Sequence, residues 1–232
     1  VMVLVSKSRD AAKRLLGDLQ AELESNDLYI HDFGAQKGEG LWTDGEFVTA
    51  SGDMFIALGR GQTPRGIKKR GIRVNYISID DIDDDEMCRN PRRVGDTVDW
   101  CLSALYGTME MGRGRFVLVG NRIGRKSVLG DMAERPHFYH TVVNALDARG
   151  RPVWKENYTL EEIHNNRVEM GERRFQKEYM NNPVNEGTIF EEKHIRFGKM
   201  LRMREYRGII CYTDPSFKSS ATADYKATML VG

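Results

Sequence analysis

Two adjacent aspartates, Asp80 and Asp81, directly follow a short apolar stretch, residues 76–79. That stretch has the composition of a β-strand, and α/β sheets place their sites at the carboxyl ends of strands. There, one carboxylate can hold Mg²⁺, usually through water, and the next can polarise an attacking water. The pair therefore predicts a Walker B strand, with Asp80 on the metal and Asp81 on the water. The alternative is a strand that runs into an acidic surface turn.

Four more acids, residues 83–86, follow this pair. Like charges at this density cannot all be buried or paired, so they are expected on the solvated surface.

A stretch rich in glycine and basic residues, residues 59–73, precedes the aspartates and includes Arg60 and Arg65. Glycine lets the main chain approach a ligand closely, and arginine forks bind oxygens in pairs. The stretch is suited to the phosphates of a nucleotide or of a DNA backbone. The alternative is a solvated basic loop.

A second stretch of this kind, residues 120–126, begins with Gly120 and Asn121 directly after the apolar run 116–119. It is expected either to contact a nucleotide at the end of a strand or to form a simple turn.

Asp214 follows another strand-like run, residues 209–213, and Asp224 lies ten residues further along the chain. RNase H-like nucleases place a metal-binding aspartate on their first strand in this manner, for two-metal phosphodiester hydrolysis. The alternative is an ordinary turn residue before proline. His137 and His140 have the spacing H-x-x-H, but no third ligand is evident, so they are interpreted as structural.

Strand-like and helix-like segments alternate through residues 1–150. This alternation predicts a parallel or mostly parallel α/β sheet that would position the aspartates. The expected strands are residues 2–5, 47–49, 54–58, 76–79, 116–119 and 139–143, and the expected helices have apolar faces at residues 12–23 and 94–105.

A helical connector is expected over residues 151–204, where Thr159 and Glu162 fit a capping box and Gly171 can separate two helices. Residues 208–212 begin a new strand, and residues 226–231 form its expected hairpin partner. Residues 205–232 therefore predict the first strands of another domain.

The overall composition excludes several classes of protein. The 232 residues carry 35 Lys and Arg against 34 Asp and Glu, so affinity for phosphate must come from local patches. Three cysteines without a C-x-x-C pair exclude a disulfide framework and the usual zinc ribbons, and indicate a reducing compartment. No apolar run reaches the length of a membrane span, and no secretion signal is recognisable, which predicts a soluble, unexported protein.

Taken in order, five segments resemble the large terminase subunit of tailed bacteriophages, the motor that packages DNA into proheads. Segment 173–190, with its F-x-x-E-Y pattern, is similar to the family's linker and is the most specific of them. The others resemble the strand and helix after the phosphate-binding loop, the Arg-Gly loop leading into the Walker B strand, the coupling segment, and the first nuclease strand. They are residues 1–20, 58–86, 115–124 and 211–217.

The resemblance implies a P-loop-type ATPase core over residues 1–150, a helical linker over 151–204, and the start of an RNase H-like nuclease domain over 205–232. It implies ATP and Mg²⁺ as cofactors, with Mg²⁺ or Mn²⁺ at the nuclease site. Double-stranded DNA, the portal protein and the small terminase subunit are the implied partners, with a homo-oligomeric ring on the prohead in the cytoplasm of the infected bacterial host. The implied residues are Asp80, Asp81 and Asp214 for catalysis, Arg60, Arg65, Gly120 and Asn121 for nucleotide binding and coupling, and Asp80, Asp214 and Asp224 for metal.

The sequence departs from the family pattern in ways that bear on activity. No G-x-x-x-x-G-K-[ST] motif occurs, so the main clamp for the β- and γ-phosphates is missing from these residues. Asp81 stands where many P-loop enzymes carry glutamate. We therefore expect the chain to be an internal fragment of a longer protein, with its phosphate loop before Val1 and the later nuclease acids beyond Gly232.

Two other functions remain open at this stage. One is a non-catalytic α/β module that binds DNA or the portal, which the missing phosphate loop favours. The other is a transposase-like RNase H enzyme, which explains Asp214 but not the Asp80 strand. Any DNA contact is expected through phosphates and should weaken steeply with salt, because no helix suited to reading bases is evident.

Overall fold

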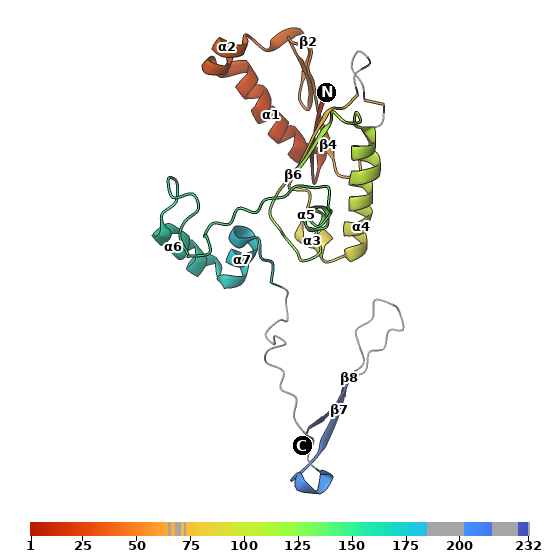
Figure 1. Cartoon of the computed structure of the whole chain (residues 1–232), viewed down its shortest axis with the longest axis vertical. Coiled ribbons are helices and arrows are strands. Elements are labelled where there is room, and N and C mark those ends of the chain that lie inside the picture. Colours follow the sequence, from red (N-terminus) through yellow and green to blue (C-terminus); the bar gives the residue numbers. More distant parts are fainter. Residues whose placement is uncertain (65, 68–70, 72, 185–201, 215–226, 232) are drawn as a thin grey trace. The chain divides into compact units, whose positions relative to one another are not determined.

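A computed structural model of the chain describes residues 1–64, 66, 67, 71, 73–184, 202–214 and 227–231. The chain divides into two compact units, Val1–Glu186 and Gly187–Gly232 (Figure 1). The candidate nucleotide site belongs to the first unit and Asp214 to the second, so the two units are described separately.

The first unit is an α/β fold built on a six-stranded mixed sheet of order β2-β3-β4-β1-β5-β6. Strands β4, β1, β5 and β6 run parallel, and β3 pairs antiparallel with both β2 and β4. The mostly parallel α/β sheet predicted from the sequence is confirmed, and it is compatible with a P-loop-type core. The strands are β1 (Met2–Ser6), β2 (Lys37–Thr43), β3 (Glu46–Thr49), β4 (Met54–Gly59), β5 (Tyr76–Asp80) and β6 (Arg115–Val119).

One face of the sheet is covered by α1 (Arg9–Ser25), which is followed by the short α2 (Asp27–Phe33). The helix α1 begins at Ser8, whose side chain accepts a hydrogen bond from the backbone N–H of Ala11 and so caps the first turn. Its buried residues Ala12, Leu16 and Leu23 pack with Phe47 and Ala57 of the sheet. Because β3, β4 and β1 carry this cluster, α1 covers only that half of the sheet.

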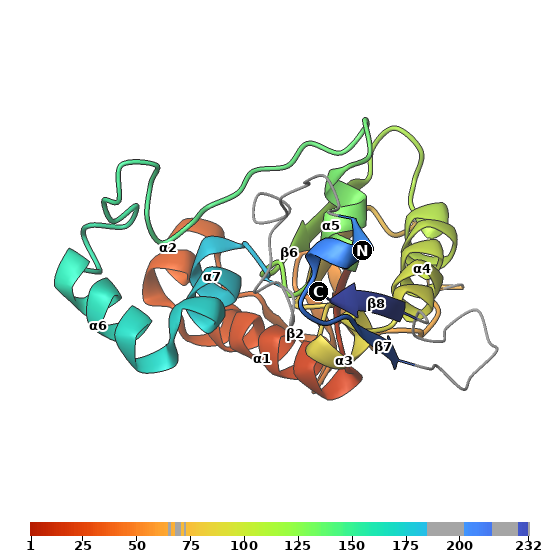
Figure 2. The same ribbon diagram turned by 90° about the horizontal axis from the view of Figure 1, so that it is seen from below.

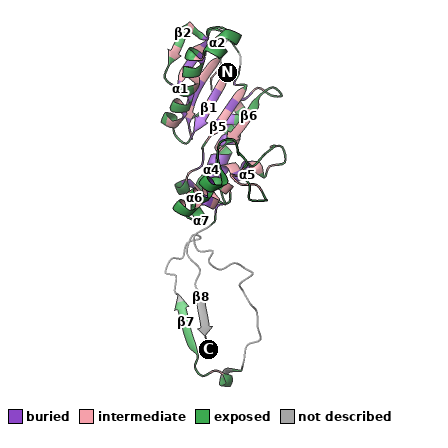
Figure 3. Cartoon of the chain, turned by 90° about the vertical axis from the view of Figure 1, so that its left-hand side faces the viewer, coloured by how far each residue is buried: buried purple, intermediate pink, exposed green. Residues whose placement is uncertain are grey.

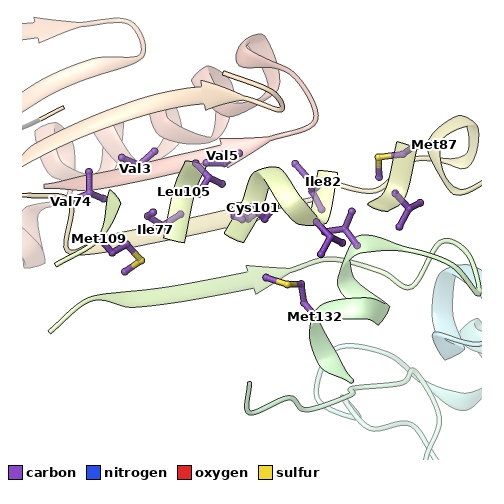
Figure 4. Close-up of a cluster of buried hydrophobic side chains, with 14 of the residues drawn as sticks. Val3, Val5, Val74, Ile77, Ile82, Met87, Cys101, Leu105, Met109 and Met132 are labelled. Atoms are coloured by element: carbon purple, nitrogen blue, oxygen red, sulfur yellow. The ribbon is translucent and has the colours of Figure 1, made fainter. Parts of the chain in front are cut away.

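The opposite face is covered by α4 (Pro91–Trp100), which continues into a π-helical turn, η1 (Cys101–Leu105), and a 3₁₀ turn, η2 (Tyr106–Thr108). Figure 2 shows α1 and α4 on the two sides of the strands. The apolar side chains of this face form the larger core, part of which is drawn in Figure 4. It contains Val3, Val5, Ile77, Ile79, Ile82, Met87, Val94, Val98, Cys101 and Leu105.

After β6 the chain forms a short helix, α5 (Val128–Ala133), and later the pair α6 (Leu160–Met170) and α7 (Glu172–Met180). Thr159 and Glu162 make the predicted capping box, and Gly171, with φ of 79°, separates the two helices as predicted. The predicted helices are therefore confirmed, and they belong to the same compact unit as the sheet, whereas their role as a linker stays a prediction.

The strand predicted at residues 139–143 is wrong, because this segment is irregular and Val142 and Val143 are exposed. Its last carbonyl, and the N–H of Ala145 beyond it, have partners other than a strand. The side chain of Asn181 donates to the carbonyl of Val143, and the N–H of Ala145 donates to the carbonyl of Tyr179. Contacts with the end of α7 thus take the place of a strand ladder.

The described part of the second unit contains a 3₁₀ turn, η4 (Met203–Glu205), and the strands β7 (Ile210–Asp214) and β8 (Ala227–Val231). The two strands pair antiparallel, with Asp214 opposite Ala227, as the predicted hairpin requires. A two-stranded hairpin does not by itself define a nuclease fold.

Among the described residues, no helix combines the length and apolar character needed to cross a membrane.

Candidate functional site at the carboxyl end of β5

Asp80 is the last residue of β5, an interior strand flanked by the parallel neighbours β1 and β6. It pairs with Val119, the last residue of β6, so both strands end at the same edge of the sheet. Buried and partly buried residues alternate along β5 (Figure 3). Ile77 and Ile79 belong to the core on the α4 face, and Asp80 therefore projects from the opposite, α1 face. The aspartate pair lies where open α/β sheets bind ligands.

The backbone of Asp81 takes a left-handed conformation, with φ of 45°, which few residues other than glycine adopt. Its N–H donates to the carbonyl of Val119 at 3.2 Å, which fixes the turn against the end of β6. Backbone strain of this kind costs of order 1–3 kcal/mol and recurs at active sites and ligand clamps. The turn that presents the second carboxylate is therefore held in place by the neighbouring strand.

Gly120 lies against this turn. A Cβ atom at Gly120 would come within 3.2 Å of the Asp81 Oδ1 atom, and the φ of Gly120 is 156°. The structure thus brings together Asp80, Asp81 and Gly120, which come from two stretches of sequence. A side chain at position 120 would crowd the carboxylate.

The electrostatics of the aspartate pair favour a cation. Partial burial raises the pKa of Asp80, and the neighbouring negative charge of Asp81 raises it further. A cation beside both carboxylates would offset the burial cost and the repulsion together.

Asp80 and Asp81 are the residues of this site that could hold a metal ion. Among the described residues, no group of three or more His, Cys, Asp or Glu side chains is arranged to hold a metal ion. Mg²⁺ commonly takes only one or two protein carboxylates and completes its octahedral shell with water and substrate phosphates. Asp80 and Asp81 supply that smaller set.

The α1 face beside the pair is only partly covered. In the register of the parallel strands, Ala57, Leu4, Ser78 and Val117 form one row across this face. Leu4 and Ala57 pack with the α1 cluster. In contrast, Val117 is only partly buried, and Val119 is 55% exposed. The half-face beside Asp80 is therefore accessible in the described structure, and β6 forms an edge of the sheet.

Arg60 follows β4 at the same edge of the sheet, but it is engaged within the protein. Its Nη1 atom donates to the carbonyl of Ile82 and to Asp84 Oδ2, both at 3.1 Å. These bonds tie the end of β4 to the segment after β5, so Arg60 positions the acidic turn. Arg65 lies outside the described residues, and a role for either arginine in nucleotide binding stays a prediction.

The expectation of a solvated acidic surface is wrong for Asp83 and only partly right for Asp84. Asp83 is buried and accepts hydrogen bonds from the N–H groups of Val128 and Leu129, at 2.8 and 3.0 Å. It thereby satisfies the first turn of α5, where a carboxylate meets the positive end of the helix. Burial nevertheless raises its pKa.

Asp84 is half-buried and caps α3 (Asp85–Cys88) by accepting from the N–H of Met87. Its pairing with Arg60 and this backbone bond lower its pKa against the opposing effect of burial. Asp85 and Glu86 are exposed, as predicted. Two of the four acids thus have structural roles.

Asn121 contacts α7, which the sequence did not indicate. Its Nδ2 atom donates to the carbonyl of Glu178 at 3.2 Å, and the N–H of Arg122 donates to Asn181 Oδ1 at 3.3 Å. On the same helix, Lys177 forms an ion pair with Asp85 at 2.9 Å. The segments after β5 and β6 are therefore both connected to α7, across sequence separations that no local pattern indicates.

Asp214 is the last residue of β7 in the second unit, and Asp224 lies outside the described residues. The nuclease metal pair therefore stays a prediction. His137 and His140 are both exposed, and neither belongs to a metal-binding group within the described part of the chain.

Comparison with known proteins adds no identification, since neither a protein-family model nor a curated protein matches the chain. The functional argument therefore depends on the geometry of the site itself.

Proposed function

We propose that this chain contains part of the ATP-hydrolysis site of a motor of the large-terminase type. The observation that carries the proposal is the placement of Asp80 and Asp81. They lie at the carboxyl end of an interior parallel strand, beside an accessible half-face of the sheet. This is the position that a Walker B pair requires, and β5 is an interior strand of the sheet.

The two carboxylates have different roles in this proposal. Mg²⁺ bound with ATP neutralises charge on the phosphates. Asp80, at the end of the regular strand, is the residue that would hold the metal, directly or through water. Asp81, on the strained turn, would orient the attacking water and accept its proton.

A phosphate-binding loop is needed for this chemistry, and we propose that it comes from a segment outside these 232 residues. Among the described strands β6 is an edge strand, and Val119 at its end is exposed, so a further segment could pack there. Determining the residues encoded before Val1 tests this directly. A Gly-Lys-Ser or Gly-Lys-Thr loop there supports the motor, and a start codon at Met2 contradicts it.

The biochemical test replaces Asp80 and Asp81 separately by asparagine in the full-length protein. Each change removes charge at nearly constant volume, and we expect Mg²⁺-dependent ATP turnover to fall by about 100-fold or more. Asp96→Asn is a matched control, because Asp96 is an exposed acid on α4. Normal turnover by Asp81→Asn protein would contradict the proposal.

The wider function of such a motor is translocation of double-stranded DNA into proheads and metal-dependent DNA cleavage. It would act with a portal protein and a small terminase subunit, as a ring on the prohead in the host cytoplasm. Asp214 and Asp224 would hold Mg²⁺ or Mn²⁺ for cleavage. The resemblance of the segments around residues 173–190 and Asp214 supports this part. Asp214→Ala should abolish DNA cleavage and leave ATP turnover unchanged.

A second function is supported by the absence of a phosphate loop from the sequence. In that case the α/β unit is a non-catalytic module that binds DNA or a portal ring. It predicts no ATP turnover in the full-length protein, and DNA or portal binding that is insensitive to Asp81→Asn.

A further inference from the structure

A cleft of about 640 Å³ lies between α7 and the segments that follow β5 and β6. Three stretches of chain line most of it: the end of α3 with Arg89, the loop of residues 123–126, and the start of α7. It does not include Asp80 or Asp81 among its lining residues. The cleft is therefore a separate feature from the candidate nucleotide site.

The lining is strongly basic although the chain as a whole is nearly neutral. Six cations and two carboxylates line the cleft, whereas the whole chain has a net charge of only +1. The cations are Arg89, Arg125, Lys126, Arg173, Arg174 and Lys177. Such a local excess attracts anions even where the overall field of the protein is weak.

The two acids of the lining are already neutralised by other side chains. Asp85 pairs with Lys177, and Glu172 pairs with Arg167, which lies on α6 outside the lining. Within the part of the chain that the structure describes, Arg89, Arg125 and Lys126 have no carboxylate partner. These three cations are available to a ligand.

The amino end of α7 adds to this positive surface. The helix has nine residues and begins after Gly171, which lines the cleft and provides no side-chain cap. An uncapped helix amino terminus carries a partial positive charge and exposes N–H donors, a combination that binds phosphate groups. The helix end and the three side chains thus favour the same kind of ligand.

We propose that this cleft binds the phosphodiester backbone of duplex DNA. Its cations come from three separate stretches of chain around the opening, an arrangement suited to successive phosphates. No aromatic side chain is among the described lining residues, so the cleft provides no platform on which the base of a free nucleotide would stack. Binding is then independent of base sequence, and it uses residues other than those of the proposed hydrolase.

The test measures binding of a fluorescein-labelled duplex of random sequence to the full-length protein, by fluorescence anisotropy without nucleotide, from 50 to 200 mM salt. The double variant Arg125→Gln with Lys126→Gln should weaken binding roughly tenfold or more at low salt. It should also reduce the slope of log K against log salt by about 1 to 2, because each phosphate contact contributes about 0.9.

A charge-matched control is Arg113→Gln with Arg115→Gln, which removes two exposed cations at the opposite, amino end of β6. It should bind DNA like the unmodified protein. The conservative pair Arg125→Lys with Lys126→Arg should retain most of the affinity, which separates loss of charge from loss of folding.

Three results would overturn the proposal: unchanged binding by the glutamine variant, an equal loss in the control, or full displacement of DNA by 1 mM inorganic phosphate at constant ionic strength. The last would identify the cleft as a site for free anions. Binding is measured without nucleotide and does not involve ATP turnover, so failure here and failure of the proposed hydrolase are distinguishable.

Discussion

The two halves of the sheet differ on the face that carries α1. Over β3, β4 and β1 this face is closed, because Leu16 and Ala12 of α1 pack with Phe47 of β3, Ala57 of β4 and Leu4 of β1. Over β5 and β6 the same face carries Ser78, Asp80, Val117 and Val119, and it is open in the described structure. The opposite face is covered by the larger core across β1, β5 and β6.

This difference shows how one sheet serves both stability and chemistry. The closed half buries apolar area and holds the strands in register, which stabilises the fold. The open half carries the partly buried carboxylate of Asp80 and the strained turn at Asp81. The fold tolerates both because β5 is held by the core on its other face. Changes in the two halves should therefore affect different properties.

The largest effect is expected from a cavity in the closed half. Leu16→Ala removes a fully buried side chain and should lower the free energy of unfolding by about 2–5 kcal/mol. Val117→Ala, on the open half, should cost about 1 kcal/mol or less, because Val117 is only partly buried. Urea unfolding at 25 °C measures both, and equal losses would show that the open half is packed as tightly as the closed one.

A glycine at the end of β4 tests how closely α1 approaches the sheet. A Cβ atom at Gly59 would lie 2.5 Å from the backbone nitrogen of Arg9, so Gly59→Ala requires the start of α1 to move. We expect a loss of about 1–3 kcal/mol in unfolding free energy. Gly17→Ala is the control, since nothing lies within 4 Å of its added Cβ. Gly17→Ala should stabilise α1 by up to about 1 kcal/mol. If both variants changed the unfolding free energy in the same direction, the close contact between Gly59 and the start of α1 would be contradicted.

The acidic segment after β5 should respond unequally to loss of charge. Asp83→Asn leaves one backbone N–H at the start of α5 without its carboxylate oxygen. It should therefore lower the free energy of unfolding by about 1–3 kcal/mol. Glu86→Gln changes an exposed residue and should alter the free energy of unfolding by no more than about 0.5 kcal/mol. Thermal unfolding compares the stability of the two variants. An Asp83→Asn protein as stable as the unmodified one would show that Asp83 does not anchor α5.

The smallest perturbation is chemical labelling of the thiols, which needs no substitution in the sequence. Burial raises the pKa of Cys88 to about 12, and the nearby carboxylate of Asp83 adds to the shift. Burial also raises the pKa of Cys101 to about 12. The reactive thiolate is therefore scarce at pH 8 and increases tenfold per pH unit, so both thiols should react with iodoacetamide at least about 100-fold more slowly than exposed Cys211. Mass spectrometry of the labelled peptides over time gives the three rates, and fast labelling of Cys101 would show that the α4 face opens.

Local patterns predicted much of the first unit. The apolar spacing of α1, the capping box at Thr159 and the break at Gly171 depend on neighbouring residues only, and the structure confirms each of them. The run at residues 139–143 has the composition of a strand but no ladder partner, and its backbone bonds to α7 instead. The composition of a segment indicates which secondary structure it can form, whereas the pairing of a strand depends on the rest of the chain.

The candidate site was predicted in part. Placing Asp80 at a strand end required only the apolar run before it, and Gly120 was located by the same reasoning. Asp83 was misassigned because its burial depends on α5, whose N–H groups lie 45 residues away in sequence. The ion pair of Lys177 with Asp85 spans 92 residues and has no sequence signal at all.

By itself the sequence determined the positions of β1, β3, β4, β5 and β6 and of the helices α1, α4, α6 and α7, and that two carboxylates end an apolar run, because these properties arise from adjacent side chains. Only the tertiary structure decided that β5 is an interior strand, that the face beside Asp80 is open, and that α7 lies against the segments after both β5 and β6. Those features depend on strand order and on packing between distant segments, and the energies of such contacts are not contained in any local stretch of the chain.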